Sequence, residues 1–162
     1  MRDCLGVLAN SEHATEDRAT FALAQLAFWL LAATDGHAKN FSIQHRRGGR
    51  FHLAPLYDVL SAWPIIGRGP NQLPYQRAKL AMALRGQNAH YRLNEIHVRH
   101  WRRLAAACGL DVFERMTAMV ARVEDALTDV EGRLPTGFPE SVWSRVAEGL
   151  RRHAAQFWKE PG

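Results

Sequence analysis

The segment "ATDGHAKNFSIQHRRGGRFHLAPLYDVLSA", residues 33–62, decides the fold of this chain. Asp35 and Asn40 stand directly behind a long apolar run, and Asp58 follows a short basic turn. If the residues between Asn40 and Asp58 fold back on themselves, the three side chains converge on one small volume. Carboxylate and amide oxygens are ligands that magnesium prefers, together with water and substrate phosphates. The segment therefore predicts a divalent-cation site built around a chain reversal.

The reversal itself is predicted by the pattern between these residues. Apolar and polar residues alternate over 41–45, the stretch "RRGGR" at 46–50 holds two glycines, and the alternation resumes over 51–53. Alternation on both sides of a glycine-containing turn is typical of a β-hairpin. Pro55 should end the second strand, because proline has no N–H for strand pairing.

The rest of the chain predicts helices. An apolar run with acidic residues at its start predicts a buried helix over 15–33. From about residue 77 the pattern is again helical, with apolar faces over 98–108 and 113–130, and a last helix begins near 139–141. The fold class is therefore mainly α with a small β-hairpin, in one domain.

Three smaller features belong to these predicted helices. Asp111 and Glu114 have the spacing of a capping box. Phe28 and Trp29 lie inside the apolar run and are interpreted as core residues rather than stacking platforms. Trp101 is expected on the buried side of its helix.

The composition indicates a single globular domain with a real core. The chain has 162 residues, of which 47% are hydrophobic and 23% charged, and its net charge is +5. Two distant cysteines, Cys4 and Cys108, fit a reducing cytoplasm better than a disulfide framework. The longest apolar run, residues 21–33, is too short for a bilayer, and we see no secretory signal, so no membrane is expected.

The order of the polar residues suggests their chemistry. Protein kinases use a catalytic aspartate, an asparagine five positions later, a strand pair and then a metal-binding aspartate. Asp35, Asn40, the predicted hairpin and Asp58 follow that order. An aspartate and asparagine at this offset would alone be a weak signal, but the full order is much more specific. The alternative is that Asp35, Asn40 and Asp58 each make only a turn hydrogen bond.

Three stretches, "TDGHAKNFSI", "LAPLYDVLSA" and "AKLAMALRGQ", resemble the C-terminal lobe of HipA-type serine/threonine kinases, the toxins of bacterial toxin–antitoxin pairs. The resemblance runs from about residue 15 to about residue 110. It implies a protein-kinase-like C-terminal lobe that uses ATP and Mg²⁺ to phosphorylate a serine or threonine of a protein substrate. The implied partner is a small helix-turn-helix antitoxin of the HipB type, so DNA would be contacted only through the antitoxin.

The resemblance also implies residue roles. Asp35 would be the catalytic base, and Asn40 and Asp58 would hold magnesium and, with it, the nucleotide. Three more side chains would border the nucleotide phosphates or the metal shell: His37, Lys39 and Tyr57. His37 could equally be a packing histidine that fixes the loop, and Lys39 a solvated charge.

Half of a kinase site is not found in the sequence. A kinase also needs a glycine-rich phosphate loop and a lysine on the nucleotide, yet the only glycine ahead of Asp35 is Gly6 and no lysine precedes Lys39. We therefore expect residues 1–162 to form one C-terminal lobe without the N-terminal nucleotide lobe, inactive alone and completed by a separate lobe. The alternative is a non-catalytic binding module that keeps the lobe fold and binds an antitoxin-like or acidic partner.

The histidines and the arginines allow two other interpretations. His37, His45 and His52 with the two aspartates could form a transition-metal site, although no helical His-x-x-x-His pair supports it. The arginine- and histidine-rich stretch 85–103 could bind nucleic acid or an acidic partner, but a solvated helix face explains it more simply.

Overall fold

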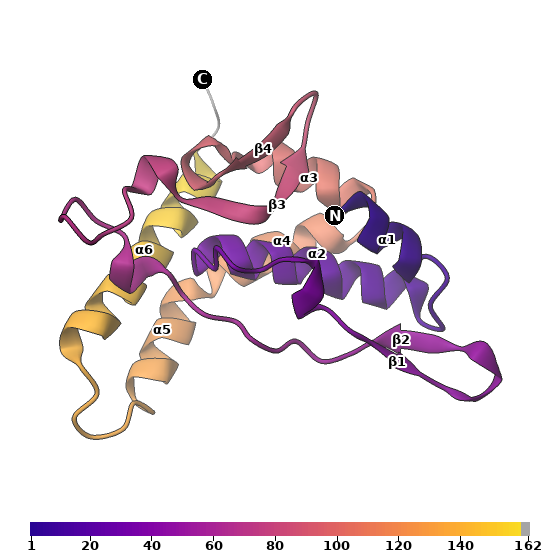
Figure 1. The fold of residues 1–162 in the computed structure, drawn as a ribbon, viewed down its shortest axis with the longest axis horizontal. Helices are drawn as coiled ribbons and strands as arrows, with labels where there is room; N and C mark the ends of the chain where they lie inside the picture. Colours follow the sequence, from indigo (N-terminus) through magenta and orange to yellow (C-terminus); the bar gives the residue numbers. More distant parts are fainter. Residues whose placement is uncertain (160–162) are drawn as a thin grey trace.

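The computed structural model describes residues 1–159 and is mainly helical (Figure 1). The helices are α1 (Arg2–Leu8), α2 (Ala14–Leu30), α3 (Val98–Ala106), α4 (Val112–Ala121), α5 (Val123–Glu131) and α6 (Glu140–Trp158). The strands form two antiparallel pairs, β1 (Ile43–His45) with β2 (Phe51–Leu53), and β3 (Lys79–Arg85) with β4 (Ala89–Arg92). The predicted mainly α class with a small hairpin is confirmed, and a second hairpin is added.

Helix α2 is the centre of the core, and α1, α3, α4 and α6 all contact it. Its apolar sequence leaves few faces for solvent, as the pattern predicts. Phe28 and Trp29 are buried, which confirms that they are core residues. The indole of Trp29 lies against Trp101, with ring centroids 5.7 Å apart. Aromatic packing at Trp29 therefore joins the C-terminal part of α2 to α3.

The first hairpin is confirmed where the alternation placed it. Ile43 pairs with Leu53 and His45 with Phe51, and Gly48 and Gly49 make the turn with φ values of 78° and 74°. Such positive φ values are easily reached by glycine, which lacks a Cβ. Figure 1 shows this hairpin projecting beyond the helices at one end of the molecule.

The helix predicted from about residue 77 is wrong, because residues 79–92 form the β3–β4 hairpin. Leu80, Met82 and Leu84 are buried, while Lys79 and Ala81 are exposed. Leucine, methionine and alanine favour helices intrinsically, but packing of this strand against α3 prevails over that preference. The alternation of exposed and buried residues over 79–82 is the period expected of a strand, not of a helix.

Two details of the C-terminal helices are also corrected. The stripe predicted over residues 113–130 is divided into α4 and α5 at Arg122, and Val130 is exposed. Asp111 precedes α4 but makes no side-chain capping hydrogen bond. The last helix begins at Glu140, as predicted.

His153 on α6 is a buried polar link between α6 and α2. It is 0% exposed. Its Nδ1 lies 2.6 Å from the Trp29 carbonyl oxygen, and its Nε2 lies 2.9 Å from the Tyr75 hydroxyl. Burial lowers the pKa of His153 to about 3. The ring is therefore neutral; its Nδ1–H donates to the carbonyl, and Nε2 accepts from the tyrosine.

This buried histidine predicts a loss of stability in acid. In the unfolded chain a histidine takes up its proton below about pH 6.5, whereas the folded chain resists protonation down to its lowered pKa. The free energy of unfolding should therefore fall as the pH falls, and His153 should account for about 2 kcal/mol between about pH 7 and pH 5. In urea titrations, His153→Gln should lose about that much less than the parent chain. His45→Gln, on the exposed hairpin, should lose as much as the parent.

Candidate functional site

The C-terminal end of α2 sets the direction of the chain that carries Asp35. The N–H of Ala33 donates to the Phe28 carbonyl at 2.7 Å, and the N–H of Ala32 donates to the Trp29 carbonyl at 3.0 Å. This pair of bonds is the Schellman ending of a helix, with Ala32 in the left-handed region at φ 50°. The helix therefore stops abruptly, and the next residues turn toward the predicted site.

The segment behind Asp58 returns to the same end of α2. Residues 61–63 donate three hydrogen bonds to the carbonyl oxygens of residues 30–32. These are Ser61 Oγ to Leu31 at 2.7 Å, Ala62 N to Ala32 at 3.2 Å, and Trp63 Nε1 to Leu30 at 2.9 Å. The last carbonyls of a helix lack partners within the helix, and these donors satisfy them. As a result, the segment that carries Asp35 and the segment that carries Asp58 both lie at the C-terminal end of α2.

Gly36 allows the loop of Asp35 to lie directly on α2. A Cβ at this position would overlap the ring of Phe28. The close approach therefore requires glycine, and it holds the loop of residues 35–40 against the helix.

Asn40 joins the two halves of the site. Its side chain is buried, with the residue 3% exposed. Its Nδ2 lies 3.3 Å from the Asp35 carbonyl oxygen, 3.4 Å from the Asp58 carbonyl oxygen and 3.2 Å from Asp58 Oδ2. The structure thus brings Asn40 and Asp58 together and ties the backbone of Asp35 to both.

Asp58 adopts an uncommon backbone conformation, with φ at 56°. Aspartate is among the few residues with a side chain that visit this left-handed region, usually as single residues in turns. Such conformations cluster at sites where function requires a particular side-chain direction. At Asp58 the turn places Oδ2 within hydrogen-bonding distance of Asn40.

The carboxylate of Asp35 is open to solvent. Its side chain is 82% exposed, and His37 Nε2 lies 3.5 Å from its Oδ1. The other ring nitrogen of His37, Nδ1, is buried and has no hydrogen-bond partner among residues 1–159. His37 therefore borders Asp35, not the Asn40–Asp58 contact.

Tyr57 and Lys39 meet through the backbone. The Tyr57 hydroxyl donates to the Lys39 carbonyl oxygen at 3.0 Å and lies 2.7 Å from Ser42 Oγ. The ring therefore clamps the short 3₁₀ turn Ala38–Asn40 from the side of Asp58. The side chain of Lys39 is exposed.

The transition-metal reading is wrong. Within residues 1–159, no group of three or more histidine, cysteine, aspartate or glutamate side chains is placed to hold a metal ion. His52 Nε2 instead lies 2.9 Å from Gln44 Oε1 across the hairpin. An amide with carboxylates is a different donor set, suited to magnesium rather than zinc.

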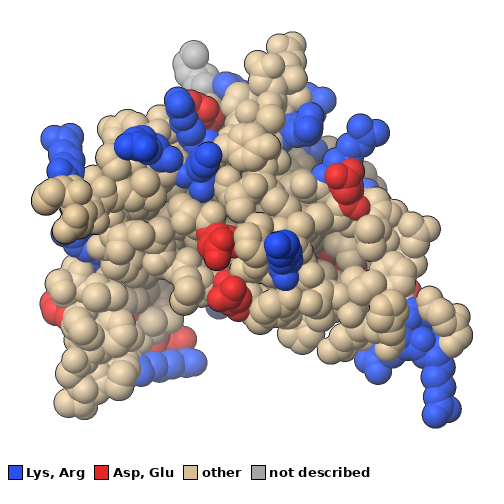
Figure 2. Space-filling view, in the orientation of Figure 1, with Lys and Arg blue, Asp and Glu red and all other residues tan. Residues whose placement is uncertain are grey.

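The electrostatics of this end of α2 favour a cation. The C-terminus of a helix carries partial negative charge, and two carboxylates, Asp35 and Asp58, lie beside it. Figure 2 shows acidic side chains near the middle of the face it views, with a basic side chain directly beside them.

The arginine- and histidine-rich stretch of residues 85–103 spans β3, β4 and α3. Arg85 is on β3, Arg92 on β4 and Arg103 on α3, and all three are exposed. Trp101 and Leu104 are buried, as predicted for this helix.

The cysteines Cys4 and Cys108 are both free thiols. No helix in residues 1–159 combines the length and apolar character needed to cross a bilayer.

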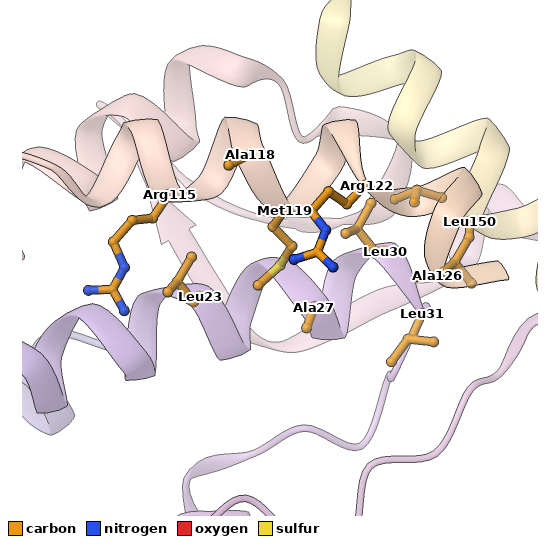
Figure 3. A pocket seen from close by; sticks show the side chains of 11 residues that line it. Leu23, Ala27, Leu30, Leu31, Arg115, Ala118, Met119, Arg122, Ala126 and Leu150 are labelled. Carbon is orange, nitrogen blue, oxygen red and sulfur yellow. The ribbon is translucent and has the colours of Figure 1, made fainter. Parts of the chain in front are cut away.

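A separate apolar cavity of about 540 Å³ lies between α2, α4 and α5 (Figure 3). Leu23 and Met119 lie across it from one another, and Arg115 and Arg122 flank it. None of the predicted site residues lines this cavity. It is therefore distinct from the Asn40–Asp58 site.

The fold and the site define a mainly helical lobe whose central helix ends beside an amide–carboxylate pair. Comparison with known families then identifies it: the model of the HipA-like C-terminal domain matches residues 1–131, and this chain belongs to that family. The resemblance noted from the sequence is thereby confirmed. Helix α6 lies beyond the matched residues.

Sequence reasoning missed the residues that support the site from a distance. Asp17 on α2 is 8% exposed, accepts a hydrogen bond from the Ser11 hydroxyl and accepts another from the Leu53 N–H at 2.9 Å. Ser61 and Trp63 hold the other end of the same segment. The sequence gives no distinct signal for Asp17, because it stands between Glu16 and Arg18 in the polar first turns of α2.

Asn40 should be the residue on which the stability of this site depends most. Asn40→Ala removes one buried donor that serves three oxygens, so the free energy of unfolding should fall by about 1–3 kcal/mol. Asn10→Ala removes a side chain that donates only to an exposed carbonyl, and it should cost less than about 0.5 kcal/mol. Urea unfolding of both variants measures the difference, and equal losses would mean that Asn40 does not organise the site.

Proposed function

We propose that this chain is the catalytic-loop and magnesium-binding lobe of a HipA-like serine/threonine protein kinase. The observation that carries the proposal is the contact of Asn40 with both the Asp35 backbone and the Asp58 carboxylate. Family membership supports the same reading. The reaction is transfer of a phosphoryl group from ATP to a hydroxyl of a protein substrate.

The donor set fits magnesium. Asn40, which is buried, would hold the ion through its amide oxygen while its Nδ2 donates to Asp58 Oδ2, and Asp58 would offer an exposed carboxylate beside it. These are oxygen donors of the kind that bind Mg²⁺ along with water and phosphates. When bound, the ion neutralises negative charge on the nucleotide phosphates.

Asp35 acts as the base. Its exposed carboxylate accepts the proton of the attacking hydroxyl, while the hydroxyl oxygen forms a bond to the transferred phosphorus and ADP leaves. His37, 3.5 Å away, positions the carboxylate. Lys39 and Tyr57 border the phosphates, with Tyr57 fixing the turn that carries Lys39 and Asn40.

The chain alone lacks part of what the reaction needs. Within residues 1–162, no lysine precedes Lys39 and no glycine-rich loop precedes Asp35. Phosphoryl transfer depends on positioning and charge stabilisation, and the loss of one such contact costs about 10²–10³ in rate. The phosphate-covering loop and the nucleotide-binding lysine are therefore supplied from outside residues 1–162, by the same polypeptide or by another. A helix-turn-helix antitoxin and a protein substrate are the other partners, in the cytoplasm.

The exposed Arg85 and Arg103 favour a second candidate, a non-catalytic module that keeps the lobe fold and binds an antitoxin-like or acidic partner. The two candidates differ in whether Asp35 and Asp58 have a chemical task.

Metal binding is tested on this chain as it stands. Mn²⁺, a paramagnetic substitute for Mg²⁺, should broaden the amide NMR signals of residues 35–40 and 57–60 selectively, because relaxation falls steeply with distance from the ion. Asp58→Asn should remove this broadening. Asp111→Asn removes an exposed acid elsewhere and should leave it intact. Broadening that survives Asp58→Asn would contradict the proposed metal site.

Catalysis is tested by radiolabelled phosphate transfer from ATP. We expect negligible transfer by residues 1–162 alone and measurable transfer when a nucleotide lobe is added, whether the same reading frame or a neighbouring one encodes that lobe. Asp35→Ala should then lower the rate by at least about 10², the usual contribution of a general base. Transfer unaffected by loss of Asp35 would remove that residue from the mechanism.

A further inference from the structure

A second apolar cavity, of about 410 Å³, lies between α1, β3 and α3 and is surrounded by arginines. Its apolar surface comes from small and aliphatic residues, including Leu5, Ala83 and Leu104. Four arginines from four elements also line it: Arg2, Arg18, Arg85 and Arg103. In Figure 2, basic side chains lie along the upper edge of the molecule, and an acidic side chain lies beside those nearest to α1.

These arginines are not neutralised by the protein. Among the described residues, no aspartate or glutamate lines the cavity, and no carboxylate pairs with Arg2, Arg85 or Arg103. Arg18 donates only to the Ala107 carbonyl, and its Nε is buried without a partner in the part of the chain described. The positive guanidinium groups around the cavity repel one another, which opposes folding. An anion bound between them would reduce this repulsion.

The cavity of Figure 3 provides the contrast. One of its two arginines, Arg115, is already paired with Glu16, with Nη2 2.8 Å from Oε1 and Nη1 3.0 Å from Oε2. Since Glu16 already neutralises Arg115, the lining of that cavity gives less reason to expect an anionic ligand. The cavity beside α1 combines an apolar floor with guanidinium groups that form no ion pair among the described residues, and no carboxylate lines it.

The chemistry of the lining selects among anions. No aromatic side chain lines the cavity, so bases of single-stranded nucleic acid have no surface on which to stack. A concave apolar floor instead receives one apolar side chain. Guanidinium groups bind carboxylates with matched geometry, through two parallel hydrogen bonds.

We propose that this cavity binds an acidic segment of a protein partner, with one large apolar side chain on the floor and flanking carboxylates on Arg85 and Arg103. The proposal specifies the acidic partner of the binding-module candidate. It does not depend on metal binding at Asp58 or on phosphoryl transfer, so either proposal can fail alone.

The test uses fluorescence anisotropy with the whole chain and a short dye-labelled peptide that holds one tryptophan among aspartates and glutamates. The double variant Arg85→Gln/Arg103→Gln should weaken binding at least about tenfold. The control pair Arg47→Gln/Arg77→Gln removes the same charge from exposed positions outside the cavity and should change the affinity less than about twofold.

The apolar floor is tested separately at Gly6. A Cβ at Gly6 meets no atom within 4 Å, so a side chain can start there without strain, and Gly6→Leu, which also favours the helix, should occupy part of the cavity. Gly6→Leu should abolish most binding, whereas Gly6→Ala should preserve it. A peptide with alanine in place of tryptophan should bind weakly to every variant.

Three results would overturn the proposal. The control arginine pair could weaken binding as much as the cavity pair, which would show attraction by net charge alone. Gly6→Leu could leave the affinity unchanged, which would show that the floor is not used. Single-stranded DNA could displace the peptide at equal concentration and lose affinity in the same variants, which would assign the cavity to nucleic acid.

Discussion

The geometry of the candidate site depends on how the last turn of α2 satisfies its carbonyl oxygens. The end of α2 is buried, and buried carbonyl groups without donors are costly. Ser61, Ala62 and Trp63 supply those donors. Each such bond contributes only about 0.5–1.5 kcal/mol net, but an unsatisfied carbonyl would cost more. The chain between Asp35 and Ser61 is therefore a closed loop whose two ends meet at one helix terminus.

The far part of that loop is fixed by a buried charge. Asp17, in the first turns of α2, accepts the N–H of Leu53 and so fixes β2 to the helix. The segment of residues 33–62 is thus held at both ends of α2, with the hairpin projecting from it. This double attachment over-determines the position of Asp58, and such over-determination is what sustains a left-handed residue with a side chain.

How far the sequence predicts this structure depends on the range of each interaction. The β1–β2 hairpin and the Asn40–Asp58 contact were accessible because alternation and a glycine turn act locally. The β3–β4 hairpin was missed because "KLAMALR" has helix-favouring residues, and only packing on α3 decides its form. Asp17, Trp63 and His153 bond to residues far along the chain, so no local pattern reports their partners.

The distribution of charge follows from the same framework. Within residues 1–159, no arginine or lysine forms an ion pair with Asp35 or Asp58, although the chain has a net charge of +5. An arginine at that site would satisfy the carboxylates directly and compete with a divalent cation. Asp17 and Arg18 are neighbours on α2, yet one bonds to β2 and the other lines the arginine cavity. One buried helix thus keeps the acidic and the basic sites apart, which is what a lobe needs if it is to bind a cation at one place and an anion at another.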